Sequence, residues 1–126
     1  MKVAIYMRFG NESQTDMDMS RVHEERLCEY ARKNNLKVAE IIKEIGSGLD
    51  MNRQGLTQML NAPVNEYQGV LTENISRIGR DMEKTLEWVD MLEKRGKKLL
   101  FVDDNNADMR AYYKQVRKLS RLGRKY

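Results

Sequence analysis

The sequence predicts an α/β domain of three layers, in which helices cover both faces of a mainly parallel central sheet. Short runs rich in β-branched and aromatic residues alternate along the chain with segments whose apolar residues recur at helical spacing. Such an alternation of strands and helices favours parallel strands joined by crossover helices. The length of 126 residues suits a single domain with one core.

Four segments are expected to form strands. The first, KVAIYMR at 2–8, runs into a loop at Gly10 and Asn11. The later candidates are 36–45, 69–74 and 97–104, and the apolar pattern of 36–45 is also compatible with a helix.

Three segments are expected to form helices, at 19–34, 54–62 and 81–95. The second stops before Pro63, and the third begins with an acid and ends with two basic residues, which suits the helix dipole. The apolar face of the first helix is expected to comprise Met19, Val22, Leu27, Tyr30 and Ala31.

The composition excludes several classes of protein. The sequence contains no run of 18 apolar residues, the length needed to span a membrane, and its first residues lack the features of a signal peptide. Cys28 is the single cysteine, so no internal disulfide can form and a reducing cytoplasm is expected; its thiol is expected to be partly buried on a helix. With one histidine and one cysteine, neither a zinc site nor another metal or cofactor is expected.

Charge is distributed unevenly along the chain. Residues 1–109 carry 16 basic and 19 acidic side chains, a net charge of −3, whereas residues 110–126 carry seven basic side chains and no acid. A basic end on a mildly acidic body indicates a polyanion partner, with nucleic acid the first choice, although a merely solvated charge run is the alternative.

The carboxyl ends of parallel strands meet at one edge of a sheet, where ligands bind in such folds. The loops expected at this edge are rich in arginine and also include GSG at 46–48 and Asp103–Asp104. Clustered guanidinium groups suit a phosphate, because each forms a planar fork of charge-assisted hydrogen bonds. The alternative is that each is a surface residue paired with a nearby acid. The four arginines are Arg8, Arg53, Arg77 and Arg80.

Four motifs in this order resemble the catalytic domain of the serine recombinases, the resolvase/invertase family. They are YMRFGNESQ at 6–14, LCEYARKNN at 27–35, GSGLDMNRQGL at 46–56 and ISRIGRD at 75–81. The resemblance covers about Lys2 to Asp104. It implies a resolvase-like fold and a metal-free attack of a serine hydroxyl on a DNA phosphodiester, with arginines stabilising the charge of the transition state. The positions that match the family's active site are Arg8, Gln14, Arg53, Arg77 and Arg80.

The sequence departs from the family at the chemistry itself. Gly10 occupies the position of the nucleophilic serine, and Ser76 occupies that of an aspartate that is a candidate acid or base. His23 and Asn52 replace a glutamine and an aspartate of the family's pattern. The isolated chain is therefore expected not to cleave DNA, with Ser13 as the fallback nucleophile and Ser76 a weaker one.

The chain is expected to divide into a resolvase-like domain at 1–107 and a basic amphipathic helix or tail at 108–126, without a separate DNA-binding domain. Apolar residues such as Met109 and Tyr113 recur at helical spacing in this tail, facing either the chain's own domain or another subunit. The basic residues proposed to bind DNA are Arg110, Lys114, Arg117, Lys118, Arg121, Arg124 and Lys125.

The expected function is a recombinase-like domain associated with DNA recombination of a mobile element, without independent catalysis. It would bind double-stranded DNA weakly and in a salt-sensitive manner, or form homodimers or heterodimers with an active recombinase. The enzyme alternative is an active, divergent recombinase that uses Ser13 or a partner subunit. A nucleotide-binding domain is a third reading, but the loops match neither a P-loop nor the dinucleotide fingerprint, and a phospho-receiver would need acids where the first strand ends in Arg8.

Overall fold

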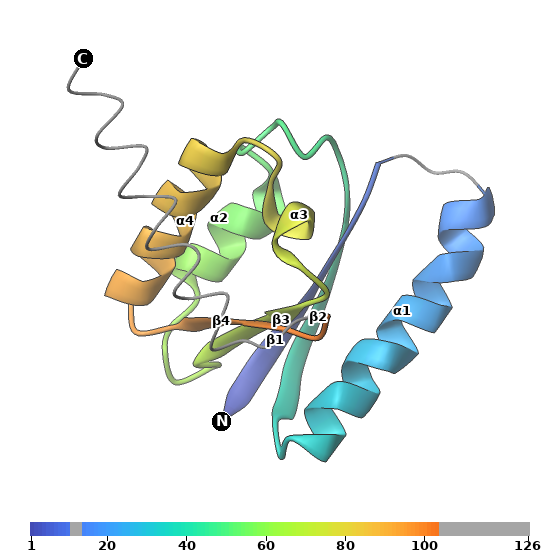
Figure 1. The fold of residues 1–126 in the computed structure, drawn as a ribbon. Coiled ribbons are helices and arrows are strands. Elements are labelled where there is room, and N and C mark those ends of the chain that lie inside the picture. Colours follow the sequence, from blue (N-terminus) through green and yellow to red (C-terminus); the bar gives the residue numbers. More distant parts are fainter. Residues whose placement is uncertain (11–13, 104–126) are drawn as a thin grey trace.

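The computed structural model describes residues 1–10 and 14–103. Their strands form a parallel sheet of four in the order β2-β1-β3-β4 (Figure 1). Each strand therefore ends at the same edge, as the sequence predicts. The strands are β1 (Lys2–Phe9), β2 (Lys37–Ile45), β3 (Gly69–Thr72) and β4 (Lys98–Phe101).

Helices cover both faces of this sheet (Figure 1). They are α1 (Gln14–Lys33), α2 (Gln54–Asn61), α3 (Ile75–Ile78) and α4 (Met82–Lys94). One core cluster joins α1 to the sheet through Leu27 and Ala31, and a second joins α2, α3 and α4 to the opposite face. The predicted three-layer architecture is confirmed.

Strand β1 runs through the middle of the molecule and is buried from Val3 to Arg8. Because side chains alternate along a strand, Ala4 and Tyr6 enter the core beneath α2 and α4, whereas Ile5 and Met7 enter the core beneath α1. The same alternation places Arg8 on the α2 side of the sheet.

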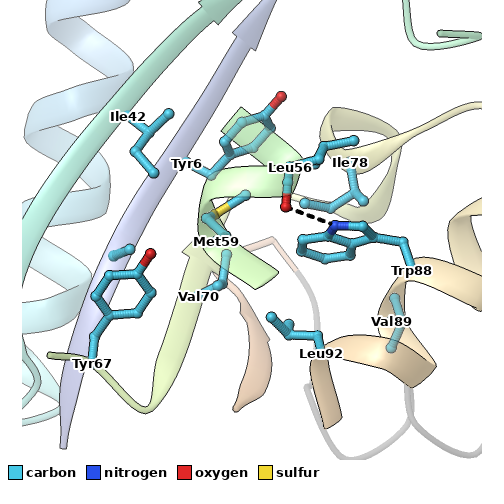
Figure 2. Close-up of a cluster of buried hydrophobic side chains, with 11 residues drawn as sticks. Tyr6, Ile42, Leu56, Met59, Tyr67, Val70, Ile78, Trp88, Val89 and Leu92 are labelled. Carbon is cyan, nitrogen blue, oxygen red and sulfur yellow. Dashed lines mark hydrogen bonds between the residues drawn. The ribbon is translucent and has the colours of Figure 1, made fainter. Parts of the chain in front are cut away.

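The larger core is closed by aromatic side chains from separate elements (Figure 2). The indole of Trp88 on α4 packs among Leu56, Ile78 and Leu92, and its Nε1 donates a hydrogen bond of 3.1 Å to the carbonyl of Leu56 on α2. This hydrogen bond joins α4 to α2.

Two expectations for the first helix are wrong. Helix α1 begins at Gln14 rather than Met19, and its exposed residues include Met19 and Val22, with 42% and 53% of their surface accessible. At 3.6 residues per turn, Val22 lies about 140° around the helix from the buried Leu27, so the two cannot share one face. Cys28 is partly buried against the α1 core, as predicted, and burial raises the pKa of its thiol.

The other boundaries differ by a few residues. Region 36–45 forms a strand and not a helix. The segment ISRIGR at 75–80, one of the arginine-bearing segments expected to be loops at the carboxyl edge, contains the one-turn helix α3. Asn74 caps this helix, because its side chain accepts a hydrogen bond from the amide of Ser76. The strands predicted at 69–74 and 97–104 end earlier, at Thr72 and Phe101.

The expectations for Ser13, Asp104 and the tail at 108–126 lie outside the described residues. Within the described residues, no helix is long and apolar enough to cross a membrane.

Candidate functional site

The carboxyl edge brings together three segments that are distant in sequence. They are the end of β1, the loop that follows β2, and α3 with the loop that follows it. Arg8, Arg53, Arg77 and Arg80 all come from these segments or border them, so the structure assembles the arginines that the sequence singled out. We refer to these four residues as the arginine edge.

Arg8 ties all three segments together. Its side chain has 5% of its surface exposed, and each guanidinium nitrogen donates to a backbone carbonyl. Nε donates to Arg77 at 3.1 Å, Nη1 to Gly46 at 2.9 Å and Nη2 to Ser76 at 3.1 Å. Arg8 therefore fixes the loop after β2 and α3 against the end of β1.

Arg53 makes a second tie between the same loops. Its Nη1 donates to the carbonyl of Ser47 at 2.8 Å, and its Nη2 donates to the carbonyls of Arg77, at 3.3 Å, and Ile78. Arg53 has 5% of its surface exposed and precedes α2, so this tie also fixes the start of that helix.

A partly buried carboxylate faces Arg53 from β2. Glu44 Oε2 lies 3.6 Å from the Nε of Arg53 and accepts a 2.6 Å hydrogen bond from the hydroxyl of Tyr6. Its Oε1 accepts from the amide of Gly55 at 2.8 Å. Burial, followed by the hydrogen bond to Glu44, raises the pKa of Tyr6 well above its usual range. Glu44 was not singled out from the sequence, where it is one of several acids in a strand of mixed polarity.

The other two arginines are less enclosed. Arg77 donates from Nη1 to the carbonyl of Arg8 at 3.2 Å, and Arg80 is exposed. The loop after β2 passes directly beneath them. A Cβ on Gly48 would lie 2.8 Å from Cγ of Arg80 and 3.2 Å from Nη2 of Arg8, so a glycine permits this close approach.

The arginine edge concentrates positive charge. The pKa of Arg8 is lowered by burial first, and then by the charges of Arg53, Arg80 and Arg77. Among the described residues, no carboxylate forms an ion pair with Arg8, Arg77 or Arg80. The expected alternative, in which each arginine pairs with a nearby acid, is therefore not seen for these three within the part of the chain that the structure describes. A bound anion would relieve their mutual repulsion.

Gly10 lies at the end of β1, immediately beyond this edge. It is exposed, and an added Cβ would meet no atom within 4 Å. The position therefore has room for a side chain. Gln14 is the first residue of α1, and Ser13 lies outside the described residues.

Ser76, the position of the family's aspartate, is occupied by contacts within its own loop. Its hydroxyl donates a 2.5 Å hydrogen bond to Oδ1 of Asn74, and its carbonyl accepts from Arg8. The hydroxyl hydrogen of Ser76 is therefore already bonded to Asn74, the residue that caps α3. Through its carbonyl, Ser76 also binds Arg8 of the arginine edge.

Two further acids stand at the ends of neighbouring strands. Glu73, directly after β3, is buried and contacts His23 and Arg26 of α1, and Asp103, after β4, also contacts Arg26. Glu73 was not singled out from the sequence, although its place at the end of a strand was visible there. Among residues 1–10 and 14–103, no three His, Cys, Asp or Glu side chains gather so as to hold a metal ion.

A four-stranded parallel sheet with arginines clustered at its carboxyl edge defines an α/β domain that gathers positive charge at one edge of the sheet. The sequence model of the resolvase N-terminal domain matches residues 3–116, which is most of the chain. The chain belongs to this family.

Known relatives agree with this assignment. A putative resolvase of Acanthamoeba polyphaga mimivirus is 37% identical over 65 residues, which are 51% of this chain and 34% of that protein. The chain thus spans about a third of that relative's length. The activity of the whole relative is therefore not assigned to this chain.

Two solved structures share the fold. The N-terminal catalytic domain of TP901-1 integrase has a TM-score of 0.77 at 21% identity, over 96% of this chain and 97% of that one. A resolvase-family site-specific recombinase from Streptococcus pneumoniae has a TM-score of 0.73 at 16% identity, over 99% and 91% of the two chains. The chain therefore has the fold of serine recombinase catalytic domains.

Proposed function

We propose that this chain is a serine-recombinase domain that binds the phosphate backbone of DNA at its arginine edge but does not cleave DNA by itself. The observation that carries the proposal is Gly10, which stands at the nucleophile position while the four arginines remain assembled. A glycine has no group that could attack phosphorus.

Three further parts of the proposal come from sequence and family. The chain would act in recombination of a mobile element in the cytoplasm, either as a homodimer or as a heterodimer with an active recombinase. The basic residues at 110–126 would add sequence-independent contacts to phosphates. Double-stranded DNA binding would then be weak and salt-sensitive, with a Kd on the order of 10⁻⁴–10⁻⁶ M at physiological salt.

Binding to duplex DNA at a series of salt concentrations tests the phosphate site. The double variant Arg77→Ala/Arg80→Ala removes the two less enclosed arginines of the edge and should weaken DNA binding. The slope of the logarithm of the binding constant against the logarithm of the salt concentration should fall by about 1 for each phosphate that is no longer neutralised. Arg32→Ala/Lys33→Ala is the matched control, because it removes two positive charges from the last turn of α1, at the opposite end of the strands.

A chain ending at Asp108 separates the tail from the arginine edge. If only this shortening weakens binding, the arginine edge does not hold DNA and the phosphate proposal fails. If neither change matters, direct DNA contact is excluded and a protein partner takes its place.

Covalent trapping of DNA distinguishes the proposal from an active divergent recombinase. The unaltered chain should form no protein–DNA adduct, and an adduct that disappears in Ser13→Ala would identify Ser13 as the nucleophile. Gly10→Ser fits the open space at this position, but it should not restore efficient recombination, because Ser76 still lacks a carboxylate and misplacement by about 1 Å costs ~10²-fold.

A further inference from the structure

Helix α1 is fastened to the carboxyl edge by a group of charged side chains. Nδ1 of His23 lies 2.5 Å from Oε1 of Glu73, and Nη1 of Arg26 lies 3.6 Å from Oε2 of the same carboxylate. Arg26 also donates from Nη2 to Asp103. His23 and Arg26 are three residues apart on one helix, so both point toward the ends of β3 and β4.

The shared carboxylate is enclosed. Glu73 has 6% of its surface exposed, and each of its oxygens faces one of these two partners. A buried charge is costly unless it is paired, so loss of either partner would leave this carboxylate poorly satisfied. The contacts with α1 are therefore more consequential than exposed ion pairs such as that of Arg32 with Glu29.

These charged contacts add to the apolar attachment of α1. Its buried apolar residues Leu27 and Ala31 pack on the sheet, whereas Met19 and Val22 are exposed. His23 and Arg26 therefore fasten the middle of the helix, just before the apolar contacts of Leu27 begin.

The same contacts lead to the arginine edge. Glu73 precedes Asn74, whose side chain caps α3 and donates to Asp103 at 3.1 Å. The carbonyl of Ser76 in α3 receives Nη2 of Arg8. The imidazole of His23 also lies 6.4 Å, between ring centroids, from Phe9, the residue before Gly10.

We propose that His23 and Arg26 are positioning residues that clamp α1 onto Glu73 and Asp103, and so hold this helix in a fixed place relative to the end of β1 and the arginine edge. The inference goes beyond the proposed function, since it holds whether or not the arginine edge binds DNA. His23 faces Glu73, which directly follows β3, with Arg26 beside it and Asp103 next along the edge. Glu24, the neighbour of His23 on α1, pairs instead with Lys43 of β2.

The contact between His23 and Glu73 is a hydrogen bond with a fixed direction. A carboxylate oxygen accepts, so Nδ1 of His23 carries the hydrogen.

Hydrogen exchange of the full chain, expressed as protection factors, tests the clamp. His23→Leu removes the donor, so it should lower protection in 14–26 relative to protection in α4. His23→Gln retains a donor and should keep more of this protection than His23→Leu does. Arg26→Gln should lower protection in 14–26 by about tenfold, the effect of removing one hydrogen bond to a charged group.

The matched control is Arg32→Gln, which removes an arginine of the same helix whose ion pair stays within α1. Equal loss of protection in 14–26 and in α4, or no loss in either, would overturn the proposal. His23 is the chain's single histidine, so its ring resonances need no assignment by mutation. An imidazole that lacks a hydrogen on Nδ1 would overturn it in the unaltered protein.

Discussion

Both glycines and arginines determine how the segments of the carboxyl edge pack together. Gly79 follows α3, and a Cβ there would lie 2.4 Å from Oγ1 of Thr85 and 2.5 Å from Sδ of Met51. Thr85 is buried on α4, so it has little freedom to yield. The segment that carries Arg77 and Arg80 can therefore pack closely against α4 only because this residue has no side chain.

Gly79→Ala should destabilise the fold by about 1–3 kcal/mol, as overpacking of a filled site does. Gly10→Ala is the control on the same edge, since nothing lies within 4 Å of its added Cβ. Urea unfolding measures both variants, and a Gly79→Ala midpoint equal to that of Gly10→Ala would show that the close contacts relax without cost.

The arginines of the edge fall into two kinds. Arg8 and Arg53 direct their donors to backbone carbonyls, whereas Arg77 and Arg80 are nearer the surface. In the sequence these residues carry equal weight, because a motif contains no information on which guanidinium groups become buried. Because they are buried and bound to backbone carbonyls, Arg8 and Arg53 hold the loops of the edge in place, and they also add positive potential there.

At the scale of elements, the sequence predicts regular segments well and exposed faces poorly. Helix α4 was predicted with an acid at its start, and the structure shows that Asp81 caps it by accepting from the amide of Lys84 at 3.1 Å. For α1, the apolar residues Met19 and Val22 suggested a buried face that the structure places in the open. The middle of that helix is held by the charged contacts of His23 and Arg26, which no apolar periodicity reveals.

Helix α3 was missed for a different reason. Its four residues are too few for a periodic pattern, and nucleation of one turn is unfavourable on its own. The turn forms because Asn74 caps it and because Arg8 and Arg53 bind its carbonyls. Its stability is therefore a property of the assembled edge.

At the scale of the whole molecule, a buried lysine should make stability depend on pH. Lys97 has 2% of its surface exposed, and its Nζ donates to the carbonyl of Leu60 at 3.2 Å. Burial lowers the pKa of this ammonium group, Arg95 lowers it further, and Glu66 opposes them. The native state thus releases this proton at a lower pH than the unfolded chain does.

In the window between the lowered pKa and the ordinary value of about 10.4, the unfolded chain binds more protons, so stability rises with pH. Lys97→Met should lack this rise. The free energy of unfolding of the unaltered protein, measured in urea from pH 8 to 10, should therefore gain on that of the variant. Lys98→Met alters an exposed neighbour and serves as the control. Parallel curves for the protein and Lys97→Met would contradict the burial of a charged group.

The sequence by itself determined the α/β class, the alternation of strands with helices and the meeting of the arginine-bearing loops at one edge, because these depend on periodicity and on the direction of parallel strands. It also determined that Gly10 carries no nucleophile, which is a matter of composition. Only the tertiary structure decided which arginines are buried, that Ser76 is engaged by Asn74, and that Glu44 and Glu73 serve the edge. Those outcomes depend on contacts between residues far apart in the chain, whose free energies arise when the strands and helices pack.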